Sequence, residues 1–304
     1  MRRWWAIVRA TTLEMSSEPL ALLLTISAVA AVMVASAFHI HQFGEPSRMA
    51  RDAGLSALLV VGLAYSVFCT IKVFRREIES GTLQMALAHP ISRTGFFLSK
   101  AAGAFLAYLV FALTVFGVVA TTVAGAEVGG QIAAPTGDVS RVWGPSLAFD
   151  AAVIVLPLVV AAALNRFARF RFTTTVTWTA LAVSLLGAAA DFALTTGLGF
   201  DRSALTTVVR VAPAAAMLVM PAAVFVAAAA AFSVRFRDNV AASLCGVLFL
   251  AALPAFGNYY LSDALSKGGS LPWTHVALAF AATAPMVAGF AFLGVHMFGE
   301  RDVG

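Results

Sequence analysis

Residues 55–73 read LSALLVVGLAYSVFCTIKV, an apolar run interrupted by a single charge, on Lys72. An apolar helix of about 20 residues spans the ~30 Å hydrocarbon core of a bilayer. A strand of a membrane barrel would instead alternate apolar and polar residues over about ten positions, and this run shows no such alternation. The stretch therefore predicts a helix that crosses a membrane.

Seven further runs have a similar length and character. They are residues 19–38, 96–124, 147–164, 173–194, 213–232, 240–261 and 276–298. The chain of 304 residues is 61% hydrophobic and 12% charged, with a mean hydropathy of +0.90, whereas soluble domains are about 45–50% apolar and about 25% charged. The sequence thus predicts an all-α fold: a polytopic membrane helical bundle of about eight transmembrane helices, forming a single transmembrane domain over residues 1–304.

Lysine and arginine favour the cytoplasmic side of a membrane protein, so their distribution predicts its orientation. With eight crossings and the N-terminus inside, 14 of the 20 Lys and Arg residues fall in cytoplasmic segments. We therefore expect both termini to be cytoplasmic. The net charge of +5 is explained by this distribution and by contact with anionic membrane lipids, and it requires no nucleic acid partner.

Residues 1–18 differ from a cleavable signal peptide, because Glu14 and Glu18 separate the basic residues from the first apolar run. One face of this segment is mostly apolar, and the other carries basic and polar groups. The first face has Trp4, Val8, Thr11 and Met15, and the second has Arg2, Arg9 and Ser16. We expect an interfacial N-terminal helix in the headgroup layer, with a frayed basic tail as the alternative.

A charged segment, residues 74–95, joins the second and third apolar runs. Within it Leu83, Ala86, Leu87 and Pro90 recur at helical spacing, which predicts a short amphipathic helix. Proline disfavours helix at the residue before it, so this helix is expected to stop just before Pro90. The segment is therefore more than a simple connection between two crossings.

The acidic residues Glu77 and Glu79 lie near the expected start of this short helix, where the helix dipole stabilises carboxylates. A polar amphipathic helix between two crossings has two uses: it lies flat on lipid headgroups, or it docks into a groove of a soluble protein. Anionic lipids repel the two carboxylates, which favours docking. The periodicity alone leaves both uses open.

The same segment contains the string E-x-G-T-L-x-x-x-L-x-x-P-x-S-R, followed after six residues by lysine. It is carried by Glu79, Gly81, Thr82, Leu83, Leu87, Pro90, Ser92, Arg93 and Lys100. In its residues and in its place after the second apolar run, the string resembles the loop between the second and third spans of type-2 ATP-binding-cassette (ABC) exporter permeases. The resemblance covers about the first 120 residues. The common plan of that family has six crossings, against the eight expected here.

This resemblance implies a permease subunit of an ATP-driven exporter in a bacterial cytoplasmic membrane. The short helix would be a coupling helix, held in a cleft of a separate ABC ATP-binding subunit, and a second permease copy or a homologous permease is implied as well. The residues implied to contact the ATPase are Glu77, Glu79, Gly81, Thr82, Leu83, Leu87, Pro90 and Arg93. Leu83 and Leu87 would fill the cleft, while Arg93 and Lys100 would hold the returning chain at the headgroups.

The resemblance also implies that ATP is bound and hydrolysed by the partner subunit, so the chain itself is expected to be no enzyme and to hold no cofactor or metal. The phosphate-binding string G-x-x-x-x-G-K-[ST] does not occur in the sequence. Cys69 and Cys245 lie within apolar runs, which is typical of packing residues.

An ion-gradient-driven secondary transporter or channel is the alternative function. Ionisable residues deep in the membrane would favour it, because they are costly and usually functional. Asp150 and Asp191 are the candidates, although both fall near the outer ends of their apolar runs. An intramembrane enzyme is the third possibility, and neither H-E-x-x-H nor G-x-S-x-G occurs in the sequence.

Overall fold

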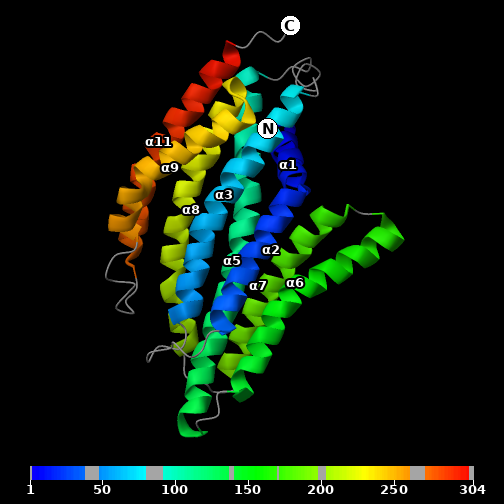
Figure 1. The fold of residues 1–304 in the computed structure, drawn as a ribbon, viewed down its shortest axis with the longest axis vertical. Coiled ribbons are helices and arrows are strands. Elements are labelled where there is room, and N and C mark those ends of the chain that lie inside the picture. The colour runs from blue at the N-terminus through cyan, green and yellow to red at the C-terminus, as the bar shows by residue number, and fades with distance from the viewer. Residues whose placement is uncertain are drawn as a thin grey trace. The chain divides into compact units, whose positions relative to one another are not determined.

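The computed structural model describes residues 2–37, 48–79, 92–136, 140–169, 171–197, 203–260 and 271–300. All regular secondary structure in these ranges is helical, and Figure 1 labels the helices. They are α1 (Arg2–Ser16), α2 (Pro19–Ala37), α3 (Arg48–Glu79), α5 (Arg93–Thr136), α6 (Ser140–Ala168), α7 (Phe172–Gly197), α8 (Ser203–Arg235), α9 (Asp238–Tyr260) and α11 (Trp273–Gly299). The all-α fold predicted from the sequence is confirmed.

The eight apolar runs of the sequence coincide with α2, α3, α5, α6, α7, α8, α9 and α11. Five helices are long and apolar enough to cross a membrane: α3 over Ala50–Glu79, α5 over Arg93–Ala124, α7 over Phe172–Ala190, α8 over Val211–Arg235 and α11 over Trp273–Gly299. The helices α1 and α2 make a sixth candidate if they are taken together across their 65° bend. A polytopic helical bundle is therefore confirmed, with five or six candidate spans in the described ranges where about eight were predicted.

The difference in the number of spans comes from α6 and α9. Their apolar parts within the described residues, Ala151–Phe167 and Asp238–Ala252, are shorter than the roughly 20 residues that cross a bilayer. Both are nevertheless helices where the sequence predicted helices. The remaining turns of α6 and α9, residues 140–150 and 253–260, lie outside the residues whose side chains the structure describes, so the prediction that both helices cross the membrane stays a prediction.

The chain forms two compact units. Unit 1 comprises Met1–Ala21, Gly62–Leu109 and Ala216–Gly304, and unit 2 comprises Leu22–Val61 and Val110–Ala215. The prediction of a single transmembrane domain over the whole chain stays a prediction. The charged segment between the second and third apolar runs belongs to unit 1, and so do the helix ends on either side of it.

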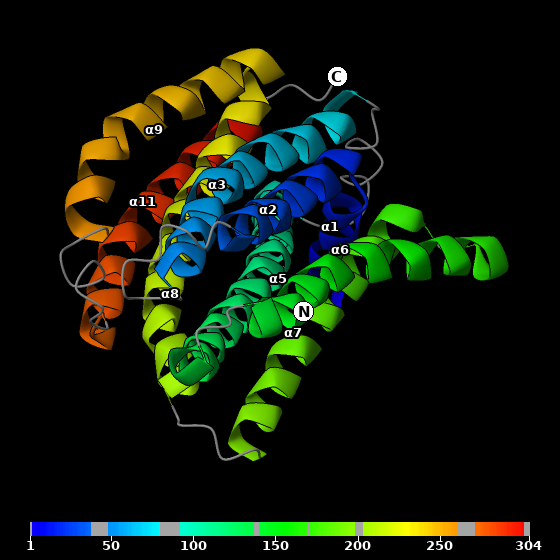
Figure 2. The ribbon, with the colours of Figure 1, turned by 60° about the horizontal axis from the view of Figure 1, so that its bottom comes forward.

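In unit 2, α6 and α7 pack against each other and lie side by side in both Figure 1 and Figure 2. Other close approaches in this unit occur at glycines, since Gly117 of α5 lies against Ser184 of α7, and Gly54 of α3 lies against Val119 of α5. Helices gain no hydrophobic stabilisation from association within lipid, so close contact at small residues is one of the ways in which they hold together.

In unit 1, α1 packs against α5 through a hydroxyl group and a glycine. The Thr12 hydroxyl donates a hydrogen bond to the Gly103 carbonyl oxygen at 3.1 Å, and a Cβ at Gly103 would lie 2.7 Å from the Val8 carbonyl oxygen. Met15 is fully buried, and so is Ser16, which we expected on the opposite, polar face of α1. The prediction for Ser16 is wrong, because the last turns of α1 are covered by protein on more than one side.

We expect Gly103→Ala to destabilise unit 1, because the added methyl group meets a backbone carbonyl oxygen that cannot rotate away. Overpacking of this kind costs about 1–3 kcal/mol, and a thermal unfolding measurement on the purified protein would detect it as a lower midpoint. Gly289→Ala in α11 is the matched control, because nothing lies within 4 Å of its Cβ position and alanine favours a helix. Equal midpoints for the two variants would contradict the contact between α1 and α5.

Candidate functional site

The predicted coupling segment leaves the end of α3 and returns at the start of α5. Of the residues expected to contact an ATPase, Gly81, Thr82, Leu83, Leu87 and Pro90 lie outside the described residues. Glu77 and Glu79 lie in the last turn of α3, and Arg93 is the first residue of α5. The structure therefore describes the two helix ends that hold this segment, and the site is built from them.

The start of α5 is fixed by two interactions. The Gly95 amide donates a hydrogen bond to the Ser92 hydroxyl oxygen at 3.1 Å, so Ser92 caps the helix, a position at which serine is strongly preferred. The Arg93 guanidinium donates a hydrogen bond to the Gly299 carbonyl oxygen at 3.1 Å. Because Gly299 ends α11 and cations stabilise helix C-termini, Arg93 fastens the start of α5 to the end of α11.

A buried ion pair joins the end of α3 to α5. The Lys100 ammonium lies 2.5 Å from a Glu77 carboxylate oxygen, and the Lys100 side chain is 1% exposed, against 27% for Glu77. The same ammonium lies 5.6 Å from the ring centroid of Phe74, within the range of a cation–π interaction. Lys100 was expected to hold the chain at the headgroups; that prediction is wrong, because its charge is enclosed by protein.

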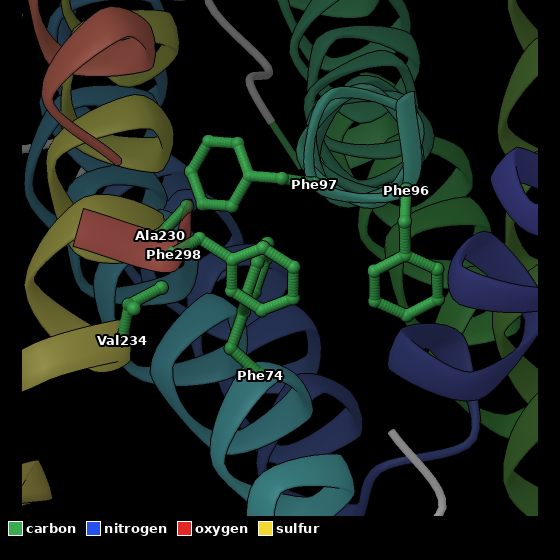
Figure 3. Packing of buried hydrophobic residues seen from close by; sticks show 6 residues of the cluster. All are labelled: Phe74, Phe96, Phe97, Ala230, Val234 and Phe298. Atoms are coloured by element: carbon green, nitrogen blue, oxygen red, sulfur yellow. The ribbon is translucent and has the colours of Figure 1, made fainter. Parts of the chain in front are cut away.

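Apolar side chains from four helices form a buried cluster that includes Phe74, the ring beside Lys100, and Figure 3 shows them. They are Phe74 of α3, Phe96 and Phe97 of α5, Ala230 and Val234 of α8, and Phe298 of α11. Ring centroids are 5.6 Å apart for Phe74 and Phe97, and 6.2 Å apart for the stacked rings of Phe96 and Phe298. Such pairs each add about 0.5–1.5 kcal/mol beyond the burial of their surface. The helix ends are therefore held by aromatic packing as well as by charge.

Glu18, at the bend between α1 and α2, is a buried carboxylate whose partners the sequence did not predict. Its carboxylate is 6% exposed and lies 2.6 Å from the Lys72 ammonium and 3.1 Å from the Arg76 guanidinium. Lys72 and Arg76 are four residues apart and share one face of α3. The signal was available, because a carboxylate directly before a long apolar run is costly to bury without a cation.

Arg75 connects α3 to α9. Its guanidinium donates a hydrogen bond to Glu79 at 2.8 Å and lies 3.0 Å from the carboxylate of Asp238, the first residue of α9. Glu79 was expected to meet cations of an ATPase or of nearby loops, and within the chain its partner is Arg75. Carboxylates in the last turn of a helix are disfavoured by the helix dipole, and Arg75 and Lys100 offset that cost for Glu79 and Glu77.

The ion pairs and aromatic contacts of these helix ends suit mechanical connection. Within the described ranges, no three His, Cys, Asp or Glu side chains lie close enough together to hold a metal ion. Cys69 and Cys245 are buried free thiols, in line with their prediction as packing residues. Asp150 and Asp191, the candidates for ion coupling, fall in α6 and α7, but their side chains lie outside the described part.

We expect Glu77→Gln to destabilise the protein more than Lys100→Met. The first change leaves the enclosed Lys100 ammonium without its carboxylate, whereas the second leaves a carboxylate that is 27% exposed to water. Breaking a buried pair from one side costs about 3–5 kcal/mol, and the double variant should recover most of that loss in thermal unfolding measurements. Glu79→Gln is the control, since an exposed pair contributes only about 0–1 kcal/mol; the reverse order of the two single variants would contradict this account.

Comparison with known protein families gives a match for part of this chain. A model of the family described as ABC-2 family transporter protein matches residues 15–179, more than half of the chain. The match includes the string from which the resemblance was drawn and extends beyond the first 120 residues. No curated protein and no solved structure matches the chain. With five apolar helices long enough to cross a membrane, the protein is a multi-pass membrane component of an ABC transporter and belongs to the ABC-2 family.

Proposed function

We propose that this permease couples ATP binding and hydrolysis, carried out by a separate ABC ATP-binding subunit, to the export of a substrate across a bacterial cytoplasmic membrane. Residues 80–91 are the segment that docks into the ATPase subunit. The observation that carries the proposal is the buried ion pair between Glu77 and Lys100, because it joins the two helices from which this segment emerges. Membership of the ABC-2 family supports the type of partner.

A segment transmits movement only if the helices at its two ends move together. The ion pair joins α3 to α5, and so does the contact between the rings of Phe74 and Phe97. A movement of the ATPase that displaces residues 80–91 would therefore displace α3 and α5 together. Nucleotide bound to the ATPase can shift the bundle between two packings only through contacts that differ between them.

The motif residues divide into two roles under this proposal. Those that contact the ATPase are Glu79, Gly81, Thr82, Leu83, Leu87 and Pro90. Glu77 and Arg93 act as positioning residues, because their charged groups are engaged within the chain, with Lys100 and with the Gly299 carbonyl oxygen. Glu79 belongs to the first group because its side chain is 62% exposed even while it pairs with Arg75.

The proposal requires further chains. The ATPases of this family act as a pair, so a second permease, identical or homologous, stands beside this one. Both termini are cytoplasmic, on the side where the ATPases bind. ATP chemistry belongs to those partner subunits, and the permease contributes the path for the substrate.

We expect Leu83→Asp to abolish most of the recovery of the ATPase when the permease is co-expressed with an ABC ATPase encoded beside it and purified through a permease tag. The new carboxylate would have to enter an apolar cleft without a partner, which costs several kcal/mol, or roughly a hundredfold or more in affinity. Recovery of the permease itself should not change.

Gln84→Asp is the matched control, because it adds the same charge to the face of the expected helix that points away from Leu83 and Leu87. It should leave ATPase recovery near the level of the unmodified protein. Normal assembly of Leu83→Asp, or equal loss in both variants, would refute docking through this face.

A further inference from the structure

The connection between α6 and α7 in unit 2 carries three exposed arginines and an exposed aromatic ring. Arg166, Arg169 and Arg171 are all exposed, and Phe167 is 87% exposed, the highest value among the large hydrophobic residues described. The helix α7 begins at Phe172, directly after Arg171, and is itself a candidate membrane span. The turn therefore lies at the boundary between the membrane and water.

These arginines differ from the cations at the end of α3. Lys72, Arg75 and Arg76 each pair with a carboxylate of the chain. In the part of the chain that the structure describes, Arg166, Arg169 and Arg171 form no ion pair, and the sequence holds no Asp or Glu between Asp150 and Asp191. Among the residues that the structure describes, the positive charge of this turn therefore has no carboxylate partner.

Arg169 adds an independent observation. Its φ is 54°, in the left-handed region, and its amide donates a hydrogen bond to the Asn165 carbonyl oxygen at 3.2 Å, which closes the end of α6. Glycine adopts this conformation without strain and is the residue usually found there. Glycine would adopt this positive φ with less backbone strain than arginine does. The presence of arginine here therefore indicates a role for its side chain.

We propose that Arg166, Arg169 and Arg171, between the end of α6 and the start of α7, bind the phosphate group of an anionic phospholipid. Guanidinium groups bind phosphate in a two-pronged arrangement that lysine cannot form, and all three cations here are arginines. The Phe167 ring enters the adjoining apolar layer, as aromatic side chains do at membrane boundaries. The same arginines also offset the negative end of the α6 dipole, but that effect explains neither the exposed ring nor the left-handed arginine.

The test uses full-length protein in detergent, titrated with phosphatidylglycerol or phosphatidylcholine, with bound lipids counted by native mass spectrometry. Each cation near an anionic lipid contributes roughly fivefold in affinity. The triple variant Arg166→Gln/Arg169→Gln/Arg171→Gln should need at least about ten times more phosphatidylglycerol for half occupancy, with no change for phosphatidylcholine. Arg169→Gly should weaken retention while its thermal unfolding midpoint stays equal or rises, because glycine fits the left-handed turn.

The control is Arg235→Gln/Arg237→Gln, which removes charge from the same Arg-Phe-Arg pattern at a turn followed by the acidic residue Asp238. It should bind phosphatidylglycerol like the unmodified protein. An equal loss of phosphatidylglycerol binding in this control would show that net charge alone explains the effect, and would overturn the site.

If soluble glycerol phosphate competed for the site as strongly as the lipid does, the assignment to a lipid would be overturned. If the triple variant kept its bound lipid but lost the ATPase, the turn would be a protein contact instead.

Discussion

The charged ammonium of Lys100 is buried in unit 1. Its loss of hydration costs roughly several kcal/mol of folding free energy unless a partner compensates it. The partner is Glu77 at 2.5 Å, supported by the face of the Phe74 ring. Glu77 belongs to the last turn of α3, and Lys100 lies near the start of α5. One interaction therefore joins the helix ends on both sides of residues 80–91. The aromatic cluster, the contacts of Glu18 with Lys72 and Arg76, and the contact of Arg75 with Asp238 add to it in the same unit.

The sequence predicted the secondary structure well and the extent of the helices less well. Each apolar run became a helix, but α3 continues past Val73 to Glu79, and α5 continues to Thr136. Apolarity ends where charges begin, whereas a helix ends where its backbone loses support. At the end of α3 the charges are paired with other helices, so the backbone continues through them. Which glycines lie against another helix, such as Gly103, depends on packing that no single stretch of sequence reveals.

The motif directed attention to the helix ends on either side of residues 80–91 but did not identify the partners of the residues there. The string that contains Ser92 and Lys100 was matched without assigning a cap to the first or a buried carboxylate to the second. The role of Ser92 depends on where α5 begins, and the role of Lys100 depends on a tertiary contact with α3. Glu18 was missed because its cations lie in another helix, although a carboxylate beside an apolar run was itself a signal. The contact residues within 80–91 rest on the resemblance alone.

Glu18 also constrains how the protein is made. It is translated 58 residues before Arg76, one of the two cations that neutralise it. While the ribosome is still extending the chain, α2 carries at its start a carboxylate that has no counter-ion and must stay near water. Both cations that neutralise Glu18 belong to the end of α3, so its charge is balanced within the chain only once that helix end has been synthesised.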